Sequence, residues 1–70
     1  MEYYIDVQWD NEAHVWCAIC DSIPLALESD SFDLLIERVK QIAPEILLEN
    51  GVSLQTSRLL FRAERVESIA

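Results

Sequence analysis

Hydrophobic and polar residues alternate along the first ten positions of the chain. Tyr4, Asp6 and Gln8 point one way, and the opposite side carries Tyr3, Ile5, Val7 and Trp9. Because successive side chains of a strand point to opposite faces, this pattern predicts a half-buried strand over residues 2–10. The polar stretch 10–13 contains no glycine but is long enough for a hairpin turn.

Residues 14–21 predict a second strand, since β-branched and aromatic residues are frequent there. The segment 22–24 ends it, because its proline cannot donate a hydrogen bond to a sheet, and residues 25–28 predict a short third strand. The preferred register turns one set of residues toward the core, namely Val15, Cys17 and Ile19 with Ile5 and Val7. Trp16 and Ala18 then lie outside with Tyr4; the alternative is a register shifted by one, in which Trp16 is buried.

The spacing of apolar residues changes to three and four after Asp30, which predicts a helix with one apolar stripe. Ser31 or Asp30 is the expected N-cap, and Asp33 lies in the first turn, where the helix dipole favours a carboxylate. Pro44 lacks a backbone N–H and is expected to kink or restart the helix, and Asn50-Gly51 is a strong stop. The stripe comprises Phe32, Leu35, Ile36, Val39, Ile42, Ala43 and Ile46.

Residues 58–66 predict a last strand, with Leu59, Phe61 and Ala63 facing the core. The order is therefore β-β-β-α-β, an α+β fold in a single domain over residues 1–70. We expect a three-stranded antiparallel meander, with the fourth strand parallel to the first after a right-handed crossover. One helix covers one sheet face, so the other face meets water or another molecule.

Length and charge narrow the classes of function. A 70-residue domain has a thin core, with a margin of roughly 3–5 kcal/mol, so we expect a homo-oligomer, a dimer or larger. The net charge is −8, and the first 49 residues carry eleven acids but only Arg38 and Lys40. This charge argues against direct nucleic-acid binding and favours a basic protein partner, although acidity alone also keeps a small protein soluble. Without a signal peptide or a membrane span, we expect a cytoplasmic protein that does not contact membranes.

Cys17 and Cys20 form a C-x-x-C pattern, which raises the question of a redox or metal site. In a strand, residues three apart point to opposite faces with Cα atoms about 10 Å apart, too far for a disulfide. A structural zinc site would also need a second pair of ligands. We therefore expect two ordinary thiols, Cys17 in the core and Cys20 near the strand end, and neither a metal nor a cofactor.

Acids and the single histidine are weak candidates for catalysis. Asp6 with Glu37 or Glu64 would be the acids of a metal-dependent nuclease, but no spacing in the sequence requires them to converge. His14 has no serine or cysteine motif beside it, and we expect it on the surface near the hairpin turn. The prediction is a protein without catalytic residues, not an enzyme.

Several segments resemble the short bacterial HicB-like family, especially its branch of standalone small domains. They are Val15-Trp16, Asp21-Ser22-Ile23-Pro24, Ser31-Phe32-Asp33-Leu34-Leu35, Pro44-Glu45-Ile46-Leu47-Leu48-Glu49-Asn50-Gly51 and, most specific, the hairpin from Trp9 to Trp16. The resemblance covers residues 2–51 and implies a partial ribonuclease-H-like fold without its catalytic acids. It also implies an antitoxin that neutralises a small basic RNA-cleaving toxin. The chain departs from the family at Leu25, commonly glycine, and at Leu34, often glutamate, and it has no room for a separate DNA-binding domain.

These arguments predict a non-catalytic protein-binding module, an antitoxin-like protein that neutralises a small basic toxin. The alternatives are a small structural or regulatory homo-oligomer and, with least support, a metal-dependent nuclease that uses Asp6. The expected interface residues are Tyr4 and Trp16 on the uncovered sheet face and Asp33 and Glu37 on the acidic helix surface.

Overall fold

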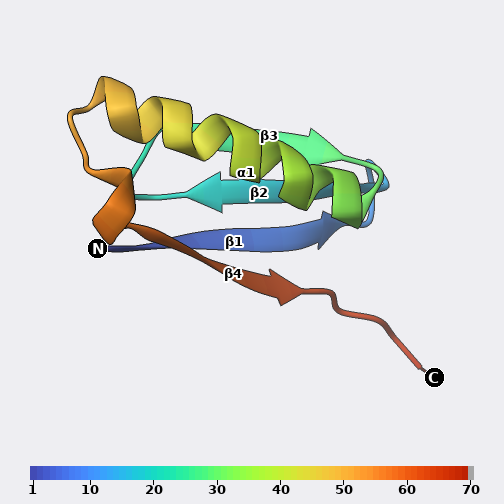
Figure 1. Ribbon diagram of the computed structural model, residues 1–70. Coiled ribbons are helices and arrows are strands. Elements are labelled where there is room, and N and C mark those ends of the chain that lie inside the picture. Colours follow the sequence, from blue (N-terminus) through green and yellow to red (C-terminus); the bar gives the residue numbers. More distant parts are fainter. Residues whose placement is uncertain (70) are drawn as a thin grey trace.

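Four strands and one long helix make up the part of the chain that the computed structural model describes, residues 1–69 (Figure 1). The strands form one sheet in the order β3-β2-β1-β4, in which β1 is antiparallel to β2 and parallel to β4. The predicted α+β fold, with its β-β-β-α-β order and its fourth strand beside the first, is confirmed. The elements are β1 (Glu2–Asp10), β2 (Val15–Cys20), β3 (Leu25–Ser29), α1 (Phe32–Glu49), a 3-10 turn (Leu54–Thr56) and β4 (Arg58–Glu64).

The β1–β2 hairpin closes without glycine because His14 adopts a positive φ of 57°. The Asp10 carboxylate accepts hydrogen bonds from the backbone N–H groups of Glu12 and Ala13, at 3.0 and 3.1 Å. The N–H of His14 donates to the Asp10 carbonyl at 2.8 Å. His14 is therefore an exposed turn residue, as predicted, and β2 begins one position later than predicted, at Val15.

The predicted register of β2 is wrong by one residue. Trp9 pairs with Trp16 and Val7 pairs with Ala18, and directly opposite residues of antiparallel strands project from the same face. Trp16 and Ala18 therefore lie on the helix side, where Ala18 is fully buried, whereas Ile19 is 52% exposed. The three residues predicted to face the core lie instead on the uncovered face: Val15, Cys17 and Ile19.

The length of the hairpin loop explains this register. The loop comprises residues 11–14 and places Asp10 opposite Val15, so odd-numbered residues of β1 share a face with even-numbered residues of β2. The predicted facing would need a loop with an odd number of residues. Cys17 and Cys20 do point to opposite faces, as predicted, but Cys20 is the buried thiol and Cys17 lies on the uncovered face.

Helix α1 begins at the predicted N-cap, where the Ser31 hydroxyl accepts a hydrogen bond from the N–H of Leu34 at 3.3 Å. The helix runs without a break through Pro44 to Glu49, so it neither ends nor restarts at the proline. Proline in a helix removes one backbone hydrogen bond, and the apolar stripe packs on both sides of that position. The buried residues of the helix are Leu35, Val39 and Ala43 of the stripe, together with Leu47, which the predicted stripe did not include.

The predicted stop at Asn50-Gly51 is confirmed, and it takes the form of a Schellman motif. Gly51 has a φ of 73°, and its N–H donates to the Leu48 carbonyl at 3.1 Å. The N–H of Val52 donates to the Leu47 carbonyl at 2.9 Å. These bonds reverse the chain so that it returns across the sheet to β4.

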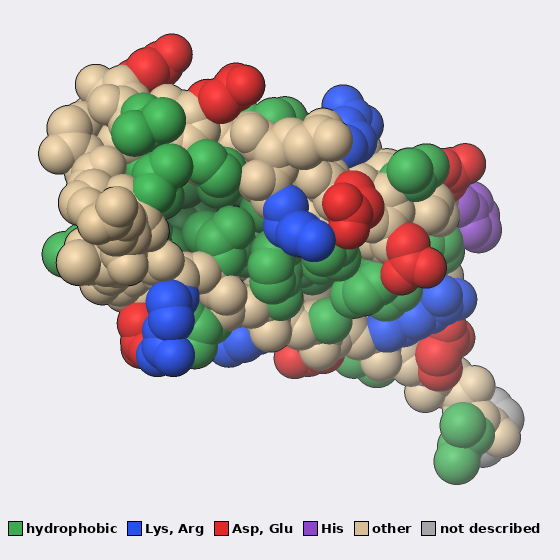
Figure 2. Space-filling model, viewed as in Figure 1, with side chains coloured by type: hydrophobic (Ala, Val, Ile, Leu, Met, Phe, Trp, Pro, Cys, Tyr) green, Lys and Arg blue, Asp and Glu red, His purple; other side chains and the backbone are tan. Residues whose placement is uncertain are grey.

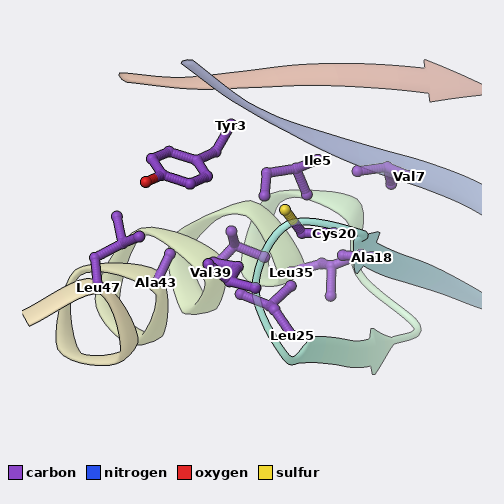
Figure 3. Close-up of a cluster of buried hydrophobic side chains, with 11 residues drawn as sticks. Tyr3, Ile5, Val7, Ala18, Cys20, Leu25, Leu35, Val39, Ala43 and Leu47 are labelled. Carbon is purple, nitrogen blue, oxygen red and sulfur yellow. The ribbon is translucent and has the colours of Figure 1, made fainter. Parts of the chain in front are cut away.

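The core lies between α1 and the sheet face beneath it (Figure 3). The helix contacts mainly β2 and β3, so β4 lies at the margin of its cover (Figure 1). Leu59 and Phe61 on β4 are half-buried against the core, whereas Ala63, predicted to face the core, is exposed because the cover does not reach it. A space-filling view shows hydrophobic side chains along the surface between the helix and β4 (Figure 2).

Candidate functional site

The uncovered sheet face carries an ion pair whose arginine lies over an exposed aromatic ring. The Arg62 guanidinium donates to both Asp6 carboxylate oxygens, from Nε at 3.0 Å and from Nη2 at 3.3 Å. It also lies 4.5 Å from the centre of the Tyr4 ring, which is 43% exposed. Ile19 projects beside Asp6 from the neighbouring strand. This face combines an exposed apolar surface with a neutralised pair of charges.

Asp6 is the acid that a nuclease site would require, and its surroundings do not resemble such a site. Its carboxylate is already bound by Arg62, and Glu37 lies on the helix, which covers the opposite face of the sheet. Glu64 shares the face of Asp6 but lies beside Gln8 in the register. Among residues 1–69, no three or more His, Cys, Asp or Glu side chains gather in a way that would hold a metal ion.

An aromatic cluster closes the core at the hairpin end of the sheet. The ring centroids of Trp9 and Trp16 are 5.4 Å apart, and those of Trp16 and Phe32 are 5.0 Å apart, both edge to face. Arg65 covers the cluster from the segment after β4, with its guanidinium 4.3 Å from the Trp9 ring and 5.8 Å from the Trp16 ring. The three aromatic side chains are half-buried, so the cluster belongs to the core and presents only part of its surface.

The four predicted interface residues do not form one surface. Tyr4 lies on the uncovered face, whereas Trp16 packs under the helix against Phe32. Asp33 and Glu37 are exposed one turn apart on α1, and Glu37 forms an ion pair with Lys40 at 3.2 Å. Trp16 cannot act together with Tyr4, because the sheet separates them.

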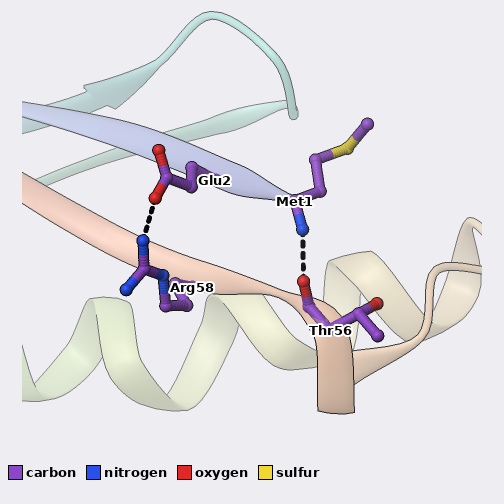
Figure 4. Close-up of polar contacts among 4 residues, drawn as sticks. All are labelled: Met1, Glu2, Thr56 and Arg58. Carbon is purple, nitrogen blue, oxygen red and sulfur yellow. Dashed lines mark hydrogen bonds and ion pairs between the residues drawn. The ribbon is translucent and has the colours of Figure 1, made fainter.

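The two edges of the sheet differ in charge. On the β4 side, Arg58 and Arg62 form ion pairs with Glu2 and Asp6 of β1 (Figure 4 for Glu2 and Arg58). Figure 4 also shows the Met1 amino group donating to the Thr56 carbonyl, which fixes the start of β1 beside β4. The sequence contains a signal for these pairs, because the two acids are separated by four positions and so are the two arginines. Only the parallel register of β1 and β4 brings them together.

On the β3 side, the charged residues of the strand and of the turns before and after it are all carboxylates. None of the ion pairs found within residues 1–69 includes these acids, which lie on β3 or in the turns before and after it: Asp21, Glu28 and Asp30. All three are exposed. β3 is also an edge strand, so its backbone is paired on one side only. The sequence shows that these acids are present, but only the strand order shows that they lie along an open edge of the sheet.

The Cys17 thiol lies close to this acidic edge. Partial burial raises its pKa above the ordinary value, and the carboxylates of Glu28 and Asp10 raise it further. A raised pKa lowers the thiolate fraction at neutral pH. Cys17 should therefore react more slowly at neutral pH than a free cysteine.

Comparison with known proteins places the chain in a family. Residues 2–69 match a family model described as a domain of unknown function, DUF1902. The chain belongs to the DUF1902 family. This DUF1902 chain is also similar to a hypothetical protein, TTHA1013, from the extremely thermophilic bacterium Thermus thermophilus. The crystal structure of that protein superposes with a TM-score of 0.73 and 32% sequence identity, covering 100% of this chain and 99% of the other.

A search of curated proteins finds no match to the DUF1902 chain. No helix within residues 1–69 has the length and apolar character needed to cross a membrane. The family description and the neighbouring structure leave the HicB-like resemblance untested, and it stays a prediction.

Proposed function

We propose that this DUF1902 chain is a non-catalytic, antitoxin-like protein that binds and neutralises a small basic protein at the acidic edge of β3. The observation that carries the proposal is the line of exposed carboxylates, Asp21, Glu28 and Asp30, along an edge strand. The HicB-like resemblance supports the class of partner, a small basic RNA-cleaving toxin. The two free thiols suit the reducing cytoplasm, where we place the protein.

An open strand edge and its acids contribute to binding in different ways. Backbone N–H and C=O groups of β3 can pair with an extended segment of a partner, which gives affinity without demanding a particular sequence. The carboxylates attract a cationic partner over a distance and raise the association rate. The same net charge of −8 repels a phosphate backbone, which supports a protein partner rather than a nucleic acid.

The proposal is tested by capturing the partner from the native host with a tagged chain and identifying it by mass spectrometry. A double variant, Glu28→Lys with Asp30→Lys, reverses the charge of the β3 edge at exposed positions. A matched control, Glu45→Lys with Glu49→Lys, makes the same change at the far end of α1. We expect a small basic protein that binds the wild type and the control but not the β3 variant.

The association rate of the captured protein gives a second readout. Raising salt from about 0.05 to about 0.5 M should slow association roughly tenfold, because the Debye length shrinks about threefold, while dissociation changes less. An acidic partner, a rate that ignores salt, or equal capture by the β3 variant would contradict the proposal. Loss of binding in the α1 control alone would place the site on the helix surface instead.

A further inference from the structure

β4 is the second open edge of the sheet, and every other residue along it points its backbone N–H and C=O groups away from β1. The N–H of Arg58 donates to the Met1 carbonyl on the β1 side. The backbone groups of successive strand residues alternate in direction. The residues whose N–H and C=O groups form hydrogen bonds with β1 are therefore Arg58, Leu60, Arg62 and Glu64. The N–H and C=O groups of the alternate residues therefore point outward, away from the sheet: Leu59, Phe61 and Ala63.

The sequence of β4 is complementary to itself when read in the opposite direction. If two copies of β4 run antiparallel with Phe61 opposite Phe61, Leu59 lies opposite Ala63 and Arg58 lies opposite Glu64. The pairs with outward backbone groups are then the hydrogen-bonded pairs, and each exchanges two N–H···O bonds. All the outward groups of the strand are satisfied, and each Arg58 gains a carboxylate across the new interface.

Neighbouring registers are less favourable because they place like charges opposite each other. A shift that centres the pairing on Leu60 brings Arg58 opposite Arg62 in both halves of the interface. A shift that centres it on Arg62 brings Arg62 opposite itself. Like charges directly opposite each other destabilise an antiparallel pair. Only the register centred on Phe61 pairs all seven residues of β4 and keeps the charges complementary.

The edge of β3 is less suited than the edge of β4 to pairing with a second copy of itself. It has five residues against seven for β4, and its flanking acids, Asp21 and Asp30, would be brought close to those of a second copy. The charge of Glu28 is uncompensated among the described ion pairs, whereas the arginines of β4 are already balanced by β1. The charge difference between the edges therefore assigns self-pairing to β4.

We propose that β4 is a dimer interface, at which two copies of this chain pair antiparallel about Phe61 to form a continuous eight-stranded sheet, twice the four strands of one chain. The two-fold axis passes perpendicular to the sheet near Phe61, so both helices lie on the same face. Arg58 then lies between Glu2 of its own chain and Glu64 of the partner. The half-buried side chains of Leu59 and Phe61 gain cover from the second strand. This dimer does not depend on the proposed basic partner, which uses the other edge.

The segment after β4 has a place in such a dimer. Val66 and Ile69 are 81% and 100% exposed, and in Figure 1 this segment extends away from the rest of the chain. Continuing the same register brings Val66 beside Thr56 of the partner, with its side chain on the uncovered face, because even-numbered residues of β4 project there. The dimer therefore gives Val66 a neighbouring chain to pack against.

The test uses charge reversal of the single complementary pair. Glu64→Arg places arginine opposite Arg58, and Arg58→Glu places glutamate opposite Glu64, so each variant alone contains two repulsive pairs across the interface. Arg58→Glu also gives up the ion pair with Glu2 of its own chain, but this loss is the same in the monomer and in the dimer. We expect each to raise the dimer dissociation constant at least about tenfold in sedimentation experiments. An equimolar mixture of the two restores both attractive pairs in a heterodimer, and its dissociation constant should return to within about threefold of the wild type.

Two further variants keep the test decisive. Ala63→Pro removes an outward N–H but no bond to β1, so it should also abolish dimerisation while circular dichroism shows a folded chain. Glu45→Arg on the exposed side of α1 makes the same charge change as Glu64→Arg and should leave the dimer intact. A wild type that is monomeric at about 100 μM, variants that dimerise like the wild type, or a mixture that fails to recover would each overturn the proposal.

Discussion

Lysine substitution at two adjacent positions of β2 tests which face of the strand is buried. Ala18 is fully buried between the sheet and α1, whereas its neighbour Ile19 is 52% exposed beside Asp6. Ala18→Lys would bury an unpaired ammonium, which costs several kcal/mol, and would overfill the core, which costs about 1–3 kcal/mol more. The total exceeds the roughly 3–5 kcal/mol that a domain of this size has available. We therefore expect the Ala18→Lys chain to be unfolded at pH 7.

Ile19→Lys introduces the same side chain one residue away and should have a small effect. It gives up part of the burial of an isoleucine, about 1 kcal/mol, and gains a cross-strand attraction to Asp6 of about 0.2–1 kcal/mol. Urea unfolding, followed by circular dichroism at one fixed protein concentration, should show a free energy of unfolding within about 1 kcal/mol of the wild type. A folded Ala18→Lys together with an unfolded Ile19→Lys would refute the register of β2.

Three further substitutions address the aromatic cluster, the thiol and the helix. Arg65→Ala should lower the free energy of unfolding by about 0.5–1 kcal/mol and shift the tryptophan emission, because the guanidinium no longer covers Trp9. An unchanged emission spectrum would count against the contact between Arg65 and Trp9. The raised pKa of Cys17 should make its alkylation at pH 8 slower than that of a free cysteine. Glu28→Gln should make the alkylation faster, and an unchanged rate would show that this carboxylate does not act on the thiol. Pro44→Ala should restore a helix hydrogen bond and raise the free energy of unfolding in urea by about 1 kcal/mol, and a loss of stability would show that the proline ring packs better than alanine.

The elements of the fold could be predicted because each has a strong local signal. Each signal depends on residues within four positions of one another in the sequence. The signals are the alternation over residues 2–10, the three-and-four spacing after Asp30, and Asn50-Gly51 at the helix end. The facing of β2 could not be derived in the same way, because apolar residues occupy both of its faces: Ala18 and Cys20 on one, Val15 and Ile19 on the other. Only the number of residues in the hairpin loop decides between the two facings, and a polar turn without glycine does not reveal that number.

The candidate surfaces were harder to predict because they depend on neighbours that are distant in the sequence. Tyr4 and Trp16 were grouped through the register of β2, so the error in that register separated them. The ion pairs of Arg58 and Arg62 depend on the parallel pairing of β1 with β4. Composition gave the total charge, but the contrast between a balanced β4 edge and an acidic β3 edge needs the strand order β3-β2-β1-β4.

The position of β4 beside β1 has a consequence for the order of folding. The contact between Asp6 and Arg62 joins residues 56 positions apart, so closing this part of the sheet costs more chain entropy than forming the β1–β2 hairpin. The meander and α1 hold mostly local contacts and should form first, and the docking of β4 should limit the folding rate. Until then β1 is itself an open edge strand, and a chain interrupted before Arg58 would expose it to unwanted pairing and aggregation.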